Sequence, residues 1–177
     1  AWLDENGIFK KTSPQPLTPM EDLPFIYDEA GRMEGFKNRI IYYETSRGCP
    51  FSCSYCLSSI DKKLRFRPLE TVKKELAFFL EQRVPQVKFV DRTFNCKKSH
   101  AMAIWQFIRD HDNGVTNFHF EIAADILDEE EIALLKTMRQ GLVQLEIGLQ
   151  TANPDTIHAI NRKMDLERVA QVTETIR

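Results

Sequence analysis

Stretches typical of β-strands alternate with stretches typical of α-helices along most of this 177-residue chain. We expect strands at residues 39–45, 86–91, 117–124 and 142–149, because these stretches are rich in β-branched, aromatic or other apolar residues. Strands that alternate with helices over short connections form parallel sheets with right-handed crossovers. The alternation therefore predicts an α/β fold with four βα units in a row.

The helices between these strands are indicated by apolar residues at helical spacing. We expect helices at residues 69–83, 99–111 and 128–141, followed by two shorter ones nearer the C-terminus. Asp128 and Glu131 have the spacing of a capping box, in which two side chains satisfy backbone N–H groups at a helix start. This pattern predicts where the third helix begins.

The first part of the chain, residues 1–38, lacks the alternation. Its prolines interrupt any long helix, so we expect an irregular linker or lead-in from an upstream domain. Residues 24–27 are apolar and are expected to pack on the main domain, which we place at residues 39–177. The chain begins with Ala1 and ends inside a predicted helix, which suggests a piece of a longer protein.

The composition excludes several classes of protein. With 28% charged and 42% hydrophobic residues, the chain has the composition of a soluble globular protein. Its net charge of −2 gives no sign of the positive surface that binds nucleic acid. No apolar run approaches the roughly 18 residues of a membrane-spanning helix, and no secretory signal is visible. We therefore expect a cytoplasmic protein that binds neither nucleic acid nor a membrane.

Three of the four cysteines, Cys49, Cys53 and Cys56, follow the first predicted strand closely. Ligands in parallel sheets bind at the carboxyl ends of strands, which is where this trio falls. Structural zinc usually takes four ligands in paired units, whereas an iron–sulfur cube held by three thiolates leaves one iron open. Spacing alone allows either metal, and the ligand count favours the cluster. Cys96 is either a fourth ligand or, as we prefer, a small buried apolar residue.

The segment TSRGCPFSCSYC at residues 45–56 resembles the signature of the radical S-adenosylmethionine (SAM) superfamily. An aromatic residue, Tyr55, stands directly before the third cysteine, as is usual there. The flanking residues are most similar to the cobalamin-dependent branch, which includes anaerobic magnesium-protoporphyrin ester cyclase-like Fe-S oxidoreductases. The resemblance covers roughly residues 20–177.

The resemblance implies a fold and a chemistry. Family barrels have six βα units, so four units would form a partial, open (β/α)6 TIM-like barrel. The three thiolates would bind a [4Fe-4S] cluster whose open iron chelates SAM, and reductive cleavage would yield a 5′-deoxyadenosyl radical. That radical would functionalise a C–H bond, by methylation, cyclisation or oxidation, in an unknown small molecule. A reductant of the flavodoxin or ferredoxin type is implied, and cobalamin would enter through a domain outside this chain.

The resemblance also implies positions that contact SAM, while no catalytic residue is assigned. These positions are Tyr55, Asp91, Glu121, Glu146, Gln150 and Arg162. An Arg fork suits the SAM carboxylate. Asp91 stands where many relatives carry Gly-Gly-Glu, so it departs from the common pattern and is equally a turn residue. Glu121 and Glu146 alternatively face solvent or pair with a lysine.

Two other classes of function compete with the enzyme. An Fe-S electron-transfer or iron-sensing module would normally offer four cysteines for each cluster. A zinc-binding structural module is the other alternative. The open edge of a partial barrel also predicts a possible edge-strand dimer, because unpaired strands template further pairing.

Overall fold

The computed structural model describes residues 1–13, 15–29, 32–36 and 38–176, so the predicted range 1–38 includes four residues outside the described part and the range 39–177 includes one. Its centre is a parallel sheet with strand order β3-β6-β7-β8. The strands are β3 (Ile41–Tyr43), β6 (Gln86–Phe89), β7 (Asn117–Ile122) and β8 (Val143–Ile147). All four predicted strands are confirmed, each shorter than expected. Within the described residues the sheet is not closed, and β3 and β8 are its edges.

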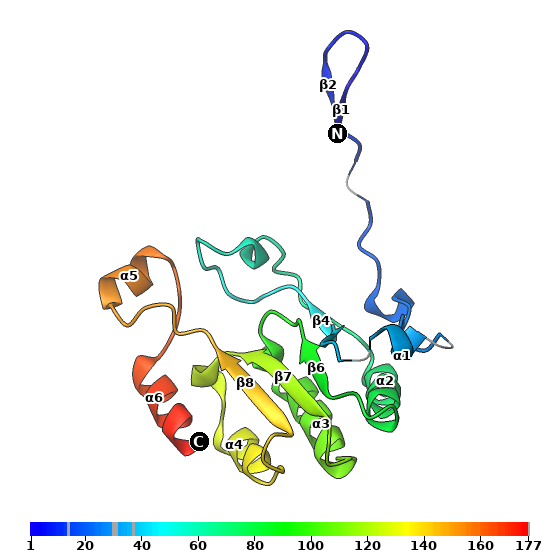
Figure 1. The fold of residues 1–177 in the computed structure, drawn as a ribbon. Coiled ribbons are helices and arrows are strands. Elements are labelled where there is room, and N and C mark those ends of the chain that lie inside the picture. The colour runs from blue at the N-terminus through cyan, green and yellow to red at the C-terminus, as the bar shows by residue number, and fades with distance from the viewer. Residues whose placement is uncertain (14, 30–31, 37, 177) are drawn as a thin grey trace.

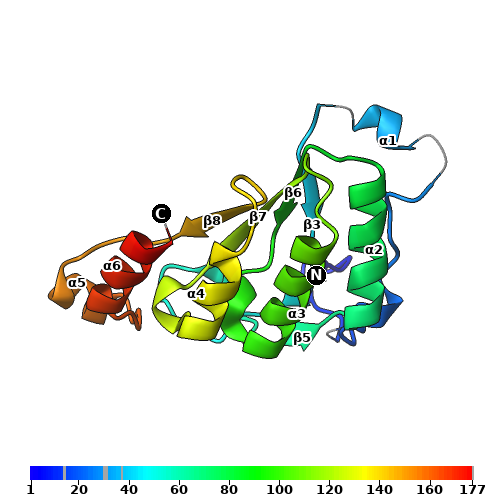
Figure 2. The ribbon, with the colours of Figure 1, turned by 90° about the horizontal axis from the view of Figure 1, so that it is seen from below.

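Helices cover one face of this sheet. Figures 1 and 2 show α2, α3 and α4 side by side against it, with α6 beyond α4. The helices are α2 (Leu69–Glu81), α3 (Lys98–Asp110), α4 (Glu129–Lys136), α5 (Pro154–Ala159) and α6 (Leu166–Thr175). The α/β class and the partial-barrel architecture predicted from the sequence are therefore confirmed.

The helix α4 is shorter than predicted. It ends at Lys136 rather than at Gly141, and the following residues form the turn into β8. Arg139 in this turn pairs with Asp112, with 2.8 Å between Nε and Oδ2, while Gly141 has a positive φ of 82°. The tertiary ion pair and the turn into the next strand replace the last helical turn that periodicity had predicted.

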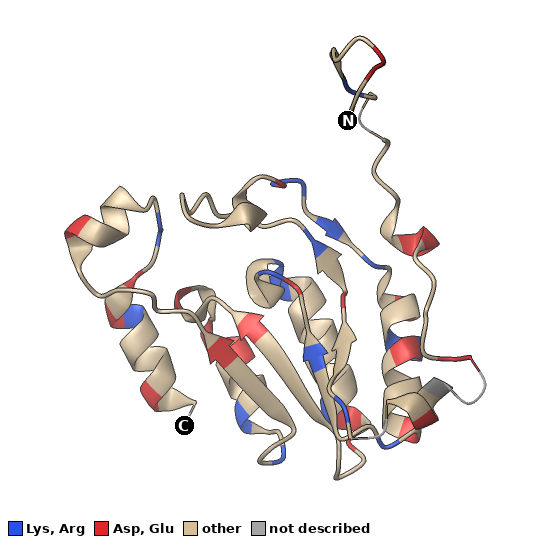
Figure 3. Ribbon diagram, turned by 45° about the horizontal axis from the view of Figure 1, so that its top comes forward, with Lys and Arg blue, Asp and Glu red and all other residues tan. Residues whose placement is uncertain are grey.

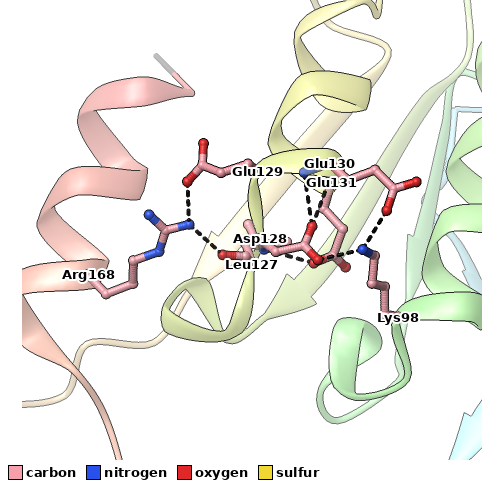
Figure 4. Close-up of polar contacts among 7 residues, drawn as sticks. All are labelled: Lys98, Leu127, Asp128, Glu129, Glu130, Glu131 and Arg168. Carbon is pink, nitrogen blue, oxygen red and sulfur yellow. Dashed lines mark hydrogen bonds and ion pairs between the residues drawn. The ribbon is translucent and has the colours of Figure 1, made fainter.

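The start of α4 is fixed as the sequence predicted. The Asp128 side chain accepts hydrogen bonds from two backbone N–H groups, and the Glu131 carboxylate accepts one from the Asp128 N–H at 3.0 Å. Lys98 of α3 reaches Asp128 at 2.5 Å, and Arg168 of α6 reaches Glu129 at 3.0 Å (Figure 4). The capping box thus also ties three helices together near the carboxyl ends of the strands.

The core between sheet and helices is aromatic. Phe120 lies 4.3 Å from both Phe89 and Phe94, centroid to centroid, and Trp105 of α3 closes the group at 6.1 Å. All four rings are fully or almost fully buried. Burial of side chains this large contributes roughly 1.5–3 kcal/mol each, so this layer carries much of the fold's stability.

The N-terminal segment is not irregular throughout, contrary to the prediction. It contains the hairpin β1 (Trp2–Leu3) with β2 (Phe9–Lys10), the short helix η1 (Met20–Asp22) and α1 (Arg32–Gly35). Asp4 organises the hairpin turn, because its carboxylate accepts from the N–H groups of Asn6 and Ile8. Figure 1 shows the hairpin extending away from the sheet. Its origin in an upstream domain stays a prediction.

The predicted contact of residues 24–27 with the main domain is present. Phe25 packs edge-on against Phe79 of α2 at 5.4 Å, and the Tyr27 hydroxyl donates to the Tyr42 carbonyl at 2.7 Å. Buried Arg67, which is paired with Glu75, donates to the backbone carbonyls of Met20 and Leu23, just before this segment. No helix in the described part of the chain combines the length and apolar character needed to cross a bilayer.

Candidate functional site

The three predicted cysteine ligands lie on one loop, residues 48–64, which we call the cysteine loop. It is bracketed by two short antiparallel strands, β4 (Ser46–Arg47) and β5 (Arg65–Phe66), which the sequence analysis did not anticipate. At its entrance Gly48 has a φ of 92°, and a Cβ there would stand 2.6 Å from the Lys63 carbonyl oxygen. Only glycine fits this close approach, and it places the Cys49 N–H 3.0 Å from the Asp61 carbonyl.

A buried carboxylate holds the root of this loop. Asp91, directly beyond β6, accepts hydrogen bonds from the Thr45 hydroxyl at 2.7 Å, the Thr45 N–H at 3.1 Å and the Ser46 hydroxyl at 2.5 Å. Burial raises the pKa of Asp91 to about 6 against these hydrogen bonds. Asp91 does not line the cavity described next, so the structure separates it from the other predicted SAM contacts. Through these hydrogen bonds Asp91 connects the segment after β6 to the start of the cysteine loop.

A cavity of about 240 Å³ opens between the cysteine loop and the carboxyl ends of β7 and β8. It brings together almost all of the predicted site. The predicted residues that line it are Cys49, Cys53, Tyr55, Cys56, Glu121, Glu146, Gln150 and Arg162. Residues up to 113 positions apart in sequence thus meet at the carboxyl ends of the strands, where parallel α/β sheets bind their ligands.

Arg162 connects the far wall of the cavity to the cysteines. Its Nη1 donates to the Tyr55 hydroxyl at 3.1 Å and lies 4.0 Å from the Cys53 sulfur, while Nη2 donates to the Gly148 carbonyl. Its Nε is buried and has no hydrogen-bond partner within the described part of the chain. A guanidinium with an unused, buried donor at a cavity wall is suited to an anionic ligand group.

The turn after α5 docks directly on the cysteine loop. The Ile160 carbonyl accepts from the Ser54 N–H at 2.9 Å, and the Asn161 side chain donates to the Ser52 carbonyl at 3.0 Å. Asn161 has a φ of 50°, a left-handed conformation that Asn tolerates better than most residues. Figure 1 shows this segment facing the loop across the top of the sheet. The turn therefore closes one side of the cavity.

The two predicted glutamates lie on the sheet face that helices α2–α4 leave uncovered. Lys88 of β6 pairs with both, 2.9 Å from Glu146 and 3.6 Å from Glu121. Figure 3 shows acidic positions on the neighbouring strands β7 and β8. The hydrogen bond from Lys88 lowers the pKa of Glu146. The His119 Nε2 lies 3.0 Å from Glu146 without forming a hydrogen bond. Each glutamate thus lines the cavity and also pairs with a lysine. The sequence analysis had treated these two arrangements as alternatives.

Several lining residues were missed by the sequence analysis. Arg92 and Thr93 follow β6 and face the cavity, and the Thr93 hydroxyl lies 3.6 Å from the Cys49 sulfur. Lys163 and Asp125 also line the cavity, from two segments further along the chain. Their position directly after a strand or beside Arg162 was the available signal, because the carboxyl ends of all parallel strands meet at one edge.

The donor set fits an iron–sulfur cluster. All four cysteines are free, and hydrogen bonds from Ser58 lower the pKa of Cys56, which favours the thiolate a metal needs. Cys96 does not line the cavity, and burial raises its pKa to about 11, which disfavours a ligand role. Among the described residues, no three His, Cys, Asp or Glu side chains are placed to hold a single metal ion.

The family comparison agrees with this geometry. The model of the radical SAM superfamily matches residues 43–177, which include the last residue of β3, the cysteine loop and everything that follows it in the chain. The chain therefore belongs to the radical SAM superfamily, a superfamily of enzymes, and the resemblance proposed from residues 45–56 is confirmed.

Two relatives share about a quarter or less of their aligned residues with this chain. The chain is 25% identical over 179 aligned positions to an uncharacterized methyltransferase of Pyrococcus horikoshii, covering 97% of this chain and 38% of that protein. It is 22% identical to the bacteriochlorophyllide d C-12(1)-methyltransferase of Chlorobaculum tepidum, covering 88% of this chain and 34% of that protein. The chain thus spans little more than a third of these relatives.

The fold is similar to that of TsrM from Kitasatospora setae, a radical SAM methyltransferase solved with cobalamin and a [4Fe-4S] cluster bound. The TM-score is 0.68 at 18% sequence identity, over 81% of this chain and 28% of that one. At this identity the likeness shows the fold alone, and it supports the partial-barrel architecture.

Proposed function

We propose that this chain is the cluster- and SAM-binding part of a radical SAM enzyme that functionalises a C–H bond of a small molecule. The observation that carries the proposal is the meeting of the thiols of Cys49, Cys53 and Cys56 with the Arg162 guanidinium at one cavity. The Nε of that guanidinium has no hydrogen-bond partner among the described residues. Three thiolates leave one iron of a cluster free for SAM, and the guanidinium suits its carboxylate.

When bound, the cluster would supply one electron for cleavage of the SAM sulfonium, and the resulting 5′-deoxyadenosyl radical would attack the substrate. The residues of this chain bind and orient. The cysteines would hold the cluster, while Glu121, Gln150 and Arg162 would position SAM over it. Tyr55 would fix the Arg162 guanidinium through their 3.1 Å hydrogen bond.

Methylation is the outcome we favour among the possible C–H reactions, because both curated relatives and TsrM are named methyltransferases. Cobalamin would then be supplied by a part of the protein outside this chain. A reductant of the flavodoxin or ferredoxin type and a cytoplasmic location belong to the same proposal.

The test is anaerobic reconstitution of the full-length protein with iron and sulfide, followed by SAM and dithionite. We expect 5′-deoxyadenosine and methionine to form, or methylated product if cobalamin and substrate are present. A full cluster without any SAM turnover would favour an electron-transfer or iron-sensing module, and retention of zinc with no cluster would favour a structural module.

A further inference from the structure

The tip of the cysteine loop exposes apolar side chains next to the third cluster ligand. Leu57 directly follows Cys56 and is 84% exposed, and Ile60 is 79% exposed. Neither belongs to the cavity lining, although their neighbours Cys56 and Ser58 do. Two large aliphatic side chains held in water at the edge of an active site are a common mark of an interaction surface.

The cysteine loop together with the strands that flank it carries an excess of positive charge. Residues 47–67 contain five basic and one acidic residue, a net of +4 in a chain whose net charge is −2. Figure 3 shows these basic residues on the loop and on β4 and β5. The rest of the chain is correspondingly acidic, so residues 47–67 form a positive stretch in an otherwise negative protein. Two of the carboxylates that pair with its arginines, Glu44 and Glu75, lie outside this stretch.

Two of these cations are available to a partner. Arg47, Arg65 and Arg67 are each paired with a carboxylate of this chain. Lys62 and Lys63 are exposed, and no carboxylate pairs with either one among the described residues. Lys62 donates only to the Ser52 hydroxyl, at 2.7 Å.

We propose that Leu57, Ile60, Lys62 and Lys63 form the docking surface for an acidic one-electron carrier protein. The inference rests on the proposed function. A small apolar centre with a charged rim fits the weak, transient complexes typical of redox partners, and opposite charge accelerates encounter. The carrier is oxidised by one electron, and the SAM sulfonium is reduced by one as a C–S bond breaks.

The test compares two reductants on the full-length, reconstituted protein. Lys62→Glu with Lys63→Glu forms one variant, and Leu57→Ser with Ile60→Ser forms a second. Lys74→Glu with Lys136→Glu is the matched control, because it makes the same charge change on exposed lysines of α2 and α4. Formation of 5′-deoxyadenosine is measured with dithionite, with reduced flavodoxin and with reduced ferredoxin.

We expect the two loop variants to lose about tenfold or more in rate with at least one protein reductant at low salt, as removal of electrostatic steering predicts. Their rates with dithionite, and both rates of the control, should stay within about twofold of wild type. The charge effect should shrink in high salt, because exposed charges are screened.

An equal loss with dithionite would overturn the proposal and would indicate that the surface packs against another part of the same protein. Unchanged rates with both protein reductants would also overturn it, as would the same loss in the control variant. Absence of turnover by the wild type with dithionite is a different result, because it would contradict the proposed function itself.

Discussion

The two faces of the central sheet differ sharply in chemistry. The helix-covered face presents Phe89, Phe118 and Phe120, which are fully buried. The opposite face presents Lys88, which pairs with Glu121 and Glu146 across three strands, and His119, which lies beside Glu146. The interior of a closed TIM barrel is normally packed with branched apolar side chains. The helix-covered face therefore stabilises the fold. The polar face and the carboxyl ends of the strands are left to bind ligands.

The largest expected effect tests the ligand edge. Cys53→Ala should abolish cluster assembly and SAM cleavage, because two thiolates cannot hold the cluster that three would hold. Cys96→Ala, which alters a thiol outside the cavity, should keep both. Iron and sulfide content after reconstitution, together with 5′-deoxyadenosine yield, measures this. Equal loss in both variants would mean that Cys96 is a ligand.

The next effect tests the helix-covered face. Phe120→Ala should lower the free energy of unfolding by about 3–5 kcal/mol, because it leaves a cavity among tightly packed rings. Glu121→Gln, on the adjacent residue and opposite face, should cost no more than about 1 kcal/mol, since its ion pair is solvated. Denaturant unfolding of the apo-proteins compares them. Similar losses would contradict the division between the faces.

A smaller effect concerns Arg162 at the cavity. Arg162→Gln should weaken SAM binding by roughly tenfold to a hundredfold, the value of a hydrogen bond to a charged group. Cluster content should remain near wild type, and Arg162→Lys should restore only part of the affinity, because Lys lacks the planar fork. Titration of SAM into the reconstituted protein measures the affinity. Unchanged binding in Arg162→Gln would exclude this residue from the SAM site.

The smallest effect is a pH dependence at the loop root. The pKa of Asp91 is raised from 3.8 to about 6, so the folded state holds this proton more tightly than the unfolded state. The resulting stabilisation is complete below about pH 4 and is lost as the pH rises through 6. Asp91→Asn removes this titration, although it costs a hydrogen bond from Thr45. His100 lies 3.2 Å from the Thr45 hydroxyl and is the same in wild type and variant, so the comparison between the two isolates the carboxyl of Asp91.

The measurement is the free energy of unfolding of apo wild type and Asp91→Asn between pH 4 and pH 7. The stability of wild type relative to the variant should fall across this range. A constant difference would show that the carboxyl of Asp91 does not titrate there, and a rising difference would reverse the sign of its coupling to folding.

Much of the fold was predictable because the relevant signals are local. Strand composition located all four strands, and the Asp128–Glu131 pair located the start of α4. The predicted end of α4 was wrong because that end depends on an ion pair between Arg139 and Asp112, which are far apart in the sequence. The strands β4 and β5 were missed because two-residue strands leave almost no pattern in a sequence.

The site was predictable only in part. The spacing of the cysteines and the strand-end positions of Glu121 and Gln150 indicated which residues would approach one edge. The role of Lys88 as a partner of both glutamates could not be seen, because it depends on which strands are neighbours. The placement of Asp91 behind the cysteine loop likewise depends on hydrogen bonds from Thr45 and Ser46, which are 46 and 45 residues away.

The most direct test of the account is Mössbauer spectroscopy of the anaerobically reconstituted full-length protein, with and without SAM. The account predicts one [4Fe-4S] cluster for each chain, in which a single iron changes its signal when SAM binds, because three are held by cysteines. A cluster whose four irons are all indifferent to SAM, or a mononuclear iron site, would contradict it.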